Sequence, residues 1–366
     1  MFLQELRLLN FRNLTKQKVD FGEGINIFYG DNAQDKTNLL EAVYLLSTSK
    51  SFRARTDHEL ITWGAAAAKV VGNASFLEIE LVVKPNKKTL LINKQERRLT
   101  DLIGSFLVVL FTPADVEIVS GSPDKRRRFL DQIGSSLSRD YLLNLVKLSR
   151  VLRTRNQLLW QVKQGKNIDL SVWDTQLAKS ATAVWKFRFE LIVLLQENLR
   201  KLARKTVGGD LKLVYATQAQ ADSDRKMQEN FLKELALLRE EEVQKSLTLI
   251  GPQRDDFKIL LEIEEGDKVV SKDLNVYGSR GEQRAASLTL KLSEIEILEK
   301  GKNTRPVLLL DDVLGELDEN HQRLLLAQLR KGQSFLTTTN IETVTKNLKG
   351  PFQKFQLEKG KITAQP

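Results

Sequence analysis

The segment "YGDNAQDKTNLLEA" differs by one residue from a phosphate-binding loop. In the pattern G-x-x-x-x-G-K-[ST], backbone N–H groups and a helix N-terminus surround phosphate oxygens, lysine adds a charge, and the hydroxyl binds Mg²⁺. Gly30, Lys36 and Thr37 occupy the required positions, but Asp35 replaces the second glycine. An apolar strand pattern precedes the loop and a helical pattern follows it, as such a site requires. Taken by itself, the segment also fits a turn before an ordinary helix.

A pair of carboxylates ends the apolar run "RPVLLLDD". This is the shape of a Walker-B strand. Asp311 is expected to hold the Mg²⁺ shell, and Asp312 to polarise the attacking water. The alternative is a strand that ends in two solvated acids.

A third candidate lies between these two motifs, in "YGSRGEQRAASL". Ser279, Gly281 and Gln283 place a hydroxyl, a glycine that permits close approach, and a helix N-terminus together. Such a group can bind a γ-phosphate supplied by another subunit. Serine and glycine before a helix are also ordinary capping residues. The order of the three motifs along the chain favours a nucleotide site.

Strand and helix patterns alternate at both ends of the chain, which predicts an α/β core with mixed sheets. The strand-like segments are "LQELRLLNF", "INIFYG", the meander from Ser75 to Leu99, "FLVVLF", "LKLVY", "FKILLEI", "PVLLLDD", "SFLTTT" and "FQKFQLEKGKI". Helical spacing is expected over 37–46, 282–298 and 320–329, and for one charged helix near "KMQENFLKELALLREEEVQK".

The middle of the chain has a different character. Helical periodicity begins after Ser122 and resumes from Ser171 to Lys205, before Gly208-Gly209 ends it. We therefore expect an all-helical arm at 116–204, inserted into a head formed by 1–115 and 205–366.

Composition excludes several classes of protein. The chain has 366 residues, 41% of them hydrophobic, with no cysteine and only two histidines, so disulfides and zinc sites are not expected. The N-terminus does not resemble a signal peptide, and "LIGSFLVVLF" is about half the length that spans a bilayer. A cytoplasmic location without membrane contact is the expectation.

The net charge of +10 suggests a polyanionic partner. Ten Lys or Arg and only three acids fall between residues 120 and 165, which favours a binding face over a merely solvated basic surface. Arg126, Arg127 and Arg128 are the DNA-binding candidates. Because three consecutive helical residues face different directions, some of them are expected to form structural ion pairs instead.

Together these motifs resemble the ABC-type ATPase heads related to SMC proteins, and in particular the RecF family of bacterial recombination mediators. The resemblance covers nearly the whole chain. Its marks are "LRLLNFRNL", the loop region through "STSKSFR", "PADVEIVSGSPDKRRRFLD", "GPQRDD", the Ser279 segment and "LLLDDVLGELD". Gln253 replaces the family's usual histidine, and Gly315 its usual serine or alanine.

The resemblance implies a P-loop ATPase head that binds ATP and Mg²⁺ and carries a helical arm. It also implies a monomer that forms a homodimer on ATP binding, with two sandwiched nucleotides. The family acts at gaps and junctions between single- and double-stranded DNA. There, with RecR and RecO, it helps RecA replace single-strand-binding protein in replication-linked recombinational repair and the SOS response.

Carried over by position, the resemblance implies roles for individual residues. Those on the nucleotide are Arg12, Gly30, Asn32, Ala33, Gln34, Asp35, Lys36, Thr37 and Asn38, with Ser279, Gly281 and Gln283 acting in trans. Thr37 and Asp311 would hold the metal, Asp311 and Asp312 would be the catalytic acids, and Asp318 would lie in a dimer-contacting loop.

Asp35 departs from the pattern in a way that bears on function. Aspartate adds a Cβ and a negative charge beside a triphosphate. Two unit charges about 4 Å apart at an effective dielectric constant near 20 repel by about 4 kcal/mol, or roughly three orders of magnitude in affinity. We therefore expect this chain to fold as its relatives do but to bind ATP, and to dimerise, poorly.

Two readings of function follow. The first is a weak DNA-dependent ATPase that acts as a clamp, slow because Asp312 is one methylene shorter than the glutamate common in ABC-type heads. The second is a non-catalytic module for DNA-junction binding and recruitment. A nuclease is disfavoured because no further acidic cluster follows residue 340.

Overall fold

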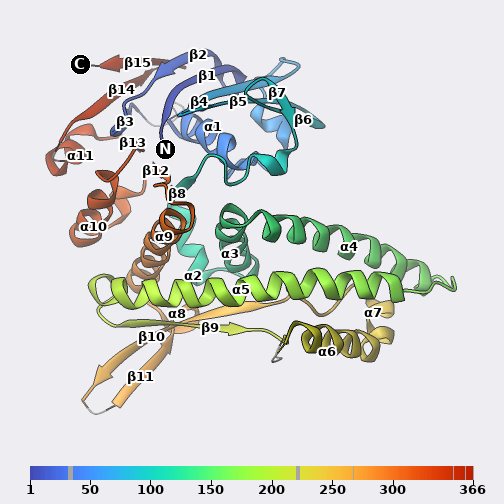
Figure 1. Cartoon of the computed structure of the whole chain (residues 1–366). Coiled ribbons are helices and arrows are strands. Elements are labelled where there is room, and N and C mark those ends of the chain that lie inside the picture. Colours follow the sequence, from blue (N-terminus) through green and yellow to red (C-terminus); the bar gives the residue numbers. More distant parts are fainter. Residues whose placement is uncertain (32–35, 220–222, 267, 349, 359, 366) are drawn as a thin grey trace. The chain divides into compact units, whose positions relative to one another are not determined.

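The computed structural model describes residues 1–31, 36–219, 223–266, 268–348, 350–358 and 360–365. Its chain forms two compact units (Figure 1). Unit 1 comprises Met1–Asp115 and Leu290–Pro366, and unit 2 comprises Val116–Thr289.

The two units differ in extent from the predicted head and arm. Both divisions separate residue 115 from residue 116, but unit 2 extends to Thr289, whereas the predicted arm ends at residue 204. Unit 2 is consequently not all-helical. The physical reason is local pairing: the Gln196 amide in the long helix of unit 2 donates to the Leu211 carbonyl (2.8 Å) and accepts from the Leu213 N–H (2.7 Å). These bonds fix the strand that follows the helix against it.

Unit 1 contains an antiparallel sheet of order β2-β1-β4-β5-β6-β7. Its strands are β1 (Leu3–Phe11), β2 (Leu14–Asp20), β4 (Ala68–Ala74), β5 (Leu77–Lys84), β6 (Lys87–Ile92) and β7 (Gln95–Arg97). Alternation of buried and exposed residues along β1 and β5 matches a sheet with one covered face. The predicted strand "LQELRLLNF" and the meander are confirmed.

The second sheet of unit 1 has the order β15-β14-β3-β13-β12-β8 and is parallel except for β15. Its strands are β3 (Ile25–Tyr29), β8 (Val108–Phe111), β12 (Val307–Asp311), β13 (Ser334–Thr338), β14 (Phe352–Glu358) and β15 (Lys361–Gln365). The fully buried runs of β8 and β13 are typical of parallel strands covered on both faces.

Helix α1 (Lys36–Thr48) packs between the two sheets of unit 1. Its residues from Leu39 to Ser47 are all buried, so it has no exposed stripe. The approach to β4 is close at Gly72, where an added Cβ would lie 2.3 Å from Leu46 Cδ1. The other α-helices among the described residues of unit 1 are α10 (Glu319–Leu329) and α11 (Ile341–Asn347), together with the C-terminal part of α9 (Arg280–Lys302).

Unit 2 combines helices with a three-stranded antiparallel sheet of order β11-β10-β9. Its helices are α2 (Glu117–Ser120), α3 (Pro123–Leu137), α4 (Arg139–Lys163), α5 (Ser171–Thr206), α6 (Asp224–Leu237), α7 (Arg239–Lys245), α8 (Leu274–Tyr277) and the start of α9. Its strands are β9 (Asp210–Ala216), β10 (Asp256–Glu265) and β11 (Lys268–Asp273). A single charged helix was expected after β9. The structure has two, α6 and α7, because the chain leaves helical geometry at Leu238.

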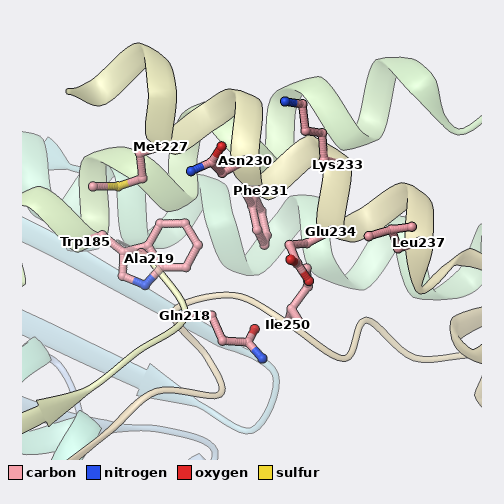
Figure 2. A pocket seen from close by; sticks show the side chains of 10 residues that line it. All are labelled: Trp185, Gln218, Ala219, Met227, Asn230, Phe231, Lys233, Glu234, Leu237 and Ile250. Atoms are coloured by element: carbon pink, nitrogen blue, oxygen red, sulfur yellow. The ribbon is translucent and has the colours of Figure 1, made fainter. Parts of the chain in front are cut away.

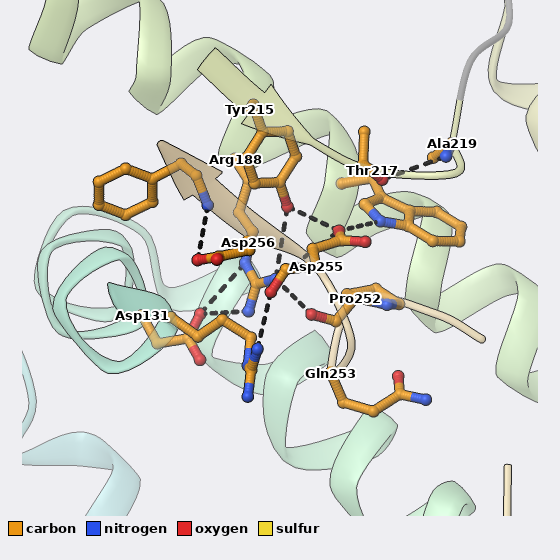
Figure 3. Close-up of polar contacts among 12 residues, drawn as sticks. Asp131, Arg188, Tyr215, Thr217, Ala219, Pro252, Gln253, Asp255 and Asp256 are labelled. Carbon is orange, nitrogen blue, oxygen red and sulfur yellow. Dashed lines mark hydrogen bonds and ion pairs between the residues drawn. The ribbon is translucent and has the colours of Figure 1, made fainter. Parts of the chain in front are cut away.

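A polar cluster joins α3, α5, β9 and the residues before β10 (Figure 3). The buried Arg188 guanidinium donates to Asp131 Oδ1 (2.8 Å) and to the Pro252 carbonyl (2.7 Å). Asp255 Oδ2 accepts from the Trp185 indole (2.5 Å) and the Tyr215 hydroxyl (2.7 Å). The "GPQRDD" segment therefore contributes to the packing of unit 2.

A second buried cluster surrounds Arg155 in α4, whose side chain is fully buried. Its guanidinium donates to Asp174 Oδ1 (2.8 Å), Thr248 Oγ1 (2.7 Å) and Glu242 Oε2 (2.5 Å). The carboxylates come from α5 and α7, so one cation connects three helices. An unpaired charge at this buried position would have a strongly unfavourable free energy, so the guanidinium requires its carboxylate partners.

Arg155→Ala should destabilise the protein by about 3–5 kcal/mol, because it leaves the buried Glu242 carboxylate without its cation. Urea unfolding followed by circular dichroism measures the change. Arg153→Ala, two residues earlier on the same helix and exposed, is the matched control and should change the free energy of unfolding by no more than about 0.5 kcal/mol. Equal effects of the two substitutions would contradict this assignment.

Candidate nucleotide site

The topology of the parallel sheet brings the predicted phosphate and metal groups to one edge. Strand β13 lies between β3 and β12, with Thr338 paired with Tyr29 and Thr337 paired with Asp311. The carboxyl ends of parallel strands meet at the same edge, which is where open α/β sheets bind ligands. The loop after β3 and the acids after β12 therefore lie together although they are distant in sequence.

Lys36, the first residue of α1, is almost completely buried. Its ammonium donates to the Gly30 carbonyl (2.6 Å) and the Asp31 carbonyl (2.8 Å). Burial lowers the pKa of Lys36, and the negative charges of Asp312, Asp31 and Asp311 oppose that shift. The lysine thus lies close to backbone carbonyls and carboxylates, and its role toward phosphate stays a prediction.

Four predicted nucleotide-binding residues, Asn32, Ala33, Gln34 and Asp35, lie outside the described residues.

Thr37 and Asp311 are in direct contact. The Thr37 hydroxyl donates to Asp311 Oδ1 at 2.8 Å, and the Thr337 hydroxyl donates to the same oxygen at 2.9 Å. Burial raises the pKa of the Asp311 carboxyl, while these two hydrogen bonds and the charge of Arg53 lower it. A hydroxyl and a carboxylate this close are the oxygen donors that Mg²⁺ takes from a protein when phosphates and water complete its shell.

The structure adds Thr337 to the predicted set. Besides its bond to Asp311, its Oγ1 accepts the Asp312 backbone N–H at 3.0 Å. Asp312 has a left-handed backbone (φ 52°) and an exposed side chain. Thr337 thus holds both the carboxylate of one acid and the backbone of the next.

Arg12 makes contacts that the prediction did not specify. Its guanidinium forms two 2.8 Å bonds with the buried Glu41 carboxylate of α1 and a third, also 2.8 Å, with the Glu59 carbonyl. The hydrogen bonds with Glu41 raise the pKa of Arg12. Arg12 therefore connects β1 to α1 close to the loop, and its role toward phosphate stays a prediction.

Asn38 and Arg53 extend the site along the start of α1. Arg53 donates to Asn38 Oδ1 (3.1 Å), and the Asn38 amide donates to Asn13 Oδ1 (2.8 Å). Arg53 is exposed, and its charge acts on Asp311. It comes from the family mark "STSKSFR" but was not among the predicted site residues; a cation shortly after the loop helix was the signal that could have identified it.

The Ser279 segment belongs to unit 2 and begins α9 with a capping box. The Ser279 N–H donates to Glu282 Oε2 (2.7 Å), and the Glu282 N–H donates to Ser279 Oγ (3.3 Å). The Gln283 amide donates to the Leu274 carbonyl (2.8 Å), and Gly281 has open space where a Cβ would project. Ser279 and Gly281 are exposed, so a ligand could reach both; their action in trans stays a prediction.

Asp318 is the N-cap of α10. Its Oδ1 accepts the N–H groups of Asn320 (2.9 Å) and His321 (3.0 Å). These bonds lower the pKa of the exposed Asp318 carboxyl, the bond from His321 most. The role predicted for Asp318 in a dimer-contacting loop stays a prediction beside this local one.

The three consecutive arginines have different surroundings, as expected. Arg126 is buried and forms a two-pronged ion pair with Asp256 (2.6 and 2.9 Å). Arg127 donates to the Asp255 carbonyl at 2.7 Å. Arg128 is exposed. Arg126 is thus a structural residue and a poor DNA contact, whereas Arg128 is available on the surface.

A cavity of about 290 Å³ lies in unit 2 between α6 and α5 (Figure 2). Trp185, Met227, Phe231 and Ile250 make it mainly apolar, and Glu234 and Lys233 lie among its other lining residues. None of the predicted site residues lines it.

Two other kinds of site are absent from the described residues. No helix among them is long and apolar enough to cross a membrane. They also contain no cluster of three or more His, Cys, Asp or Glu side chains able to hold a metal ion. A metal at Thr37 and Asp311 would therefore depend on ligand oxygens in addition to these two residues.

The parallel sheet, its buried loop helix and the acids at the end of β12 define an ABC-type ATPase head. The sequence profile of the RecF/RecN/SMC N-terminal domain family matches residues 2–363. The chain belongs to this family and, within it, to the RecF proteins.

Relatives and solved structures agree with this assignment. The chain is 38% identical over 360 residues to the DNA replication and repair protein RecF of Thermoanaerobacter sp. (strain X514), covering 96% of both chains. It is also 38% identical to that of Exiguobacterium sp. over 379 residues, covering 99% of both. A solved structure of the recombination mediator protein RecF with ATPrS in the RecFOR pathway matches with a TM-score of 0.90 at 34% identity, over 99% of this chain and 98% of that one.

Thr337→Val should weaken Mg·ATP binding roughly tenfold, because a lost hydrogen bond to a charged group is worth about 1.5 kcal/mol. It should also raise the pKa of Asp311 further, since the carboxylate loses a donor. The metal needs the ionised form, so the loss of affinity on acidification should begin at higher pH in the variant. Calorimetric titrations across pH, in an Asp35→Gly background, measure both effects.

Two controls accompany that titration. Thr337→Ser retains the hydroxyl and should bind as the parent does. Thr338→Val alters the neighbouring buried threonine, whose hydroxyl bonds to the Asn340 carbonyl (3.1 Å), and should leave the pH midpoint in place. A midpoint that moves equally in Thr337→Val and Thr338→Val would contradict the role of Thr337.

Proposed function

We propose that this chain is an ATP-controlled DNA clamp of recombinational repair. Two heads would close on two nucleotides, and the closed dimer would hold DNA at gaps or junctions between single and double strands. There it would act with RecR and RecO to help RecA replace single-strand-binding protein, during replication-linked repair and the SOS response in the cytoplasm. The relatives' names as replication and repair proteins, and the RecFOR pathway of the matching structure, support this assignment.

The observation that carries the proposal is the contact between Thr37 and Asp311. A hydroxyl and a carboxylate 274 residues apart in sequence meet at 2.8 Å, beside the lysine that begins α1. That combination serves a nucleotide phosphate and its cation. Matching structures with ATP and ATPrS support ATP as the ligand.

Each residue at this edge has a definite task in the proposal. Lys36 would exchange its carbonyl partners for phosphate oxygens, and Thr37 and Asp311 would hold Mg²⁺. Bound there, Mg²⁺ would neutralise charge on the phosphates. Asp312, exposed beside them, would orient a water and accept its proton as that water attacks the γ-phosphorus and the bond to ADP breaks.

Asp35 is the reason to consider a second function beside the ATP-controlled clamp. With a negative charge in the phosphate loop, the chain as it stands would bind ATP weakly and remain monomeric. It would then act as a non-catalytic module that recognises DNA junctions and recruits partners. Nucleotide affinity decides between the two readings.

Asp35→Gly should strengthen ATP binding by up to about three orders of magnitude, because it removes roughly 4 kcal/mol of repulsion. Isothermal titration of the unaltered chain and the variant with Mg·ATP measures the gain. Asp35→Asn removes the charge but keeps the side chain, so it separates repulsion from steric obstruction. Equal and tight affinities for the unaltered chain and the Asp35→Gly variant would contradict the proposal.

The same pair of chains tests the clamp itself. Sedimentation with ATP should give a dimer for Asp35→Gly and mainly monomer for the unaltered chain. Turnover should rise when gapped DNA is added to the dimer. A restored chain that binds ATP tightly but neither dimerises nor responds to gapped DNA would leave the nucleotide site intact and refute the clamp.

Asp312→Glu, in the Asp35→Gly background, should raise turnover by roughly tenfold, because the longer carboxylate reaches the attacking water better. Single-turnover hydrolysis isolates the chemical step. ATP affinity should stay the same, since Asp312 is not expected to bind the metal. An unchanged rate would remove the geometric explanation for slow hydrolysis.

A further inference from the structure

Cations of the basic segment 120–165 differ in whether their side chains have ion-pair or hydrogen-bond partners. Lys125 pairs with Glu117, Arg126 with Asp256 and Arg155 with Asp174, while Arg127 and Lys163 donate to backbone carbonyls. By contrast, the side chains of Lys147, Arg150 and Arg153 have no hydrogen-bond or ion-pair partner within the described ranges. All three lie on α4.

These three cations lie on the side of α4 that faces away from its buried residues. They recur every three residues and are exposed, as are Gln157 and Trp160 farther along the same face. The opposite side of the helix is buried in unit 2 through Leu148, Val151, Arg155 and Leu159. At about 100° and 1.5 Å per residue, this stripe curves over an arc of about 140° around the helix and extends about 20 Å from Lys147 to Trp160.

The stripe lacks the acids that accompany cations elsewhere on unit 2. The only acid of α4 is Asp140, in its first turn. On α6 and α7, Arg225 pairs with Glu229 and Lys245 with Glu241, each one helical turn apart. A solvated helix face normally carries such pairs. Three unpaired cations in a row are complementary to a regular line of negative charges.

Trp160 adds an aromatic surface at the end of the stripe. Its side chain is 55% exposed, one helical turn beyond Gln157. Exposed aromatic rings beside cations stack on unpaired bases, which is how single-stranded nucleic acid is commonly held. An acidic protein surface would match the charges but would give the indole no comparable role.

We propose that this face of α4 (Lys147, Arg150, Arg153, Gln157 and Trp160) is a DNA contact. The three cations bind successive phosphates of the duplex, and the Trp160 indole stacks on an unpaired base where the duplex ends. The inference rests on the proposed function, of which it specifies the DNA-binding surface and the orientation of the junction along it.

The test removes the three charges together. In the full chain, with and without Asp35→Gly and ATP, Lys147→Gln/Arg150→Gln/Arg153→Gln should reduce the slope of log affinity against log salt by about 2–3, at roughly 0.9 per phosphate contact. The matched control is Lys179→Gln/Lys201→Gln/Lys205→Gln on α5, which removes the same charge from exposed positions of the same unit. It should leave most of the slope intact. Thermal unfolding checks that both triple variants remain folded.

Trp160→Leu tests the junction end independently. It should weaken binding to gapped DNA several-fold while leaving binding to blunt duplex unchanged. An equal loss on both substrates, or none, would overturn the stacking assignment. Equal slopes for the two triple variants, or a slope that the α4 variant leaves unchanged, would overturn the α4 assignment and favour an acidic protein partner for this face. A parent chain that binds no DNA would instead refute the proposed function together with this surface.

Discussion

The contact of Thr37 with Asp311 depends on one topological constraint, the insertion of β13 between β3 and β12. That order places Thr337 where its hydroxyl reaches both Asp311 and the backbone of Asp312. The position of α1 follows from the same constraint, because a helix that starts at the end of β3 can run back only between the two sheets. Its buried length then leaves Lys36 and Thr37 little freedom. A substitution that loosened the packing of α1 would consequently disturb ligand geometry before it unfolded the unit.

The cations of unit 2 form two groups, one buried and paired with carboxylates, the other exposed to solvent. Arg126, Arg155 and Arg188 are buried and satisfied by carboxylates from other elements, so their charges hold helices and strands together. A buried cation with such partners has no exposed N–H donor for a polyanion, and the neighbouring carboxylates offset its charge. The charge that can act at a distance belongs to exposed side chains without acids nearby, and net charge by itself does not distinguish the two groups.

Local sequence patterns predict the helices and strands, but they do not predict which residues of distant elements contact one another. The apolar runs of β3, β12 and β13 and the periodicity of α5 follow from burial, which leaves a direct trace in sequence. Thr337 has no such trace in the sequence, because the contact of this threonine of "SFLTTT" with Asp311 depends on β13 lying next to β12. The extent of unit 2 as far as Thr289 has no local trace in the sequence either, because it depends on β9 pairing with β10 and on Gln196 bonding to β9. Likewise, "KRRR" does not reveal which arginine meets Asp256, 130 residues away.

The described contacts also bear on how a charge at position 35 would act. Lys36 is held by the carbonyls of Gly30 and Asp31, and Asp311 by Thr37 and Thr337. These contacts join described residues on both sides of the loop, so the lysine, the hydroxyl and the carboxylate are held in place before any ligand arrives. Under the proposed function, the charge of Asp35 would act on a triphosphate that approaches these fixed groups, and nucleotide affinity would report its effect.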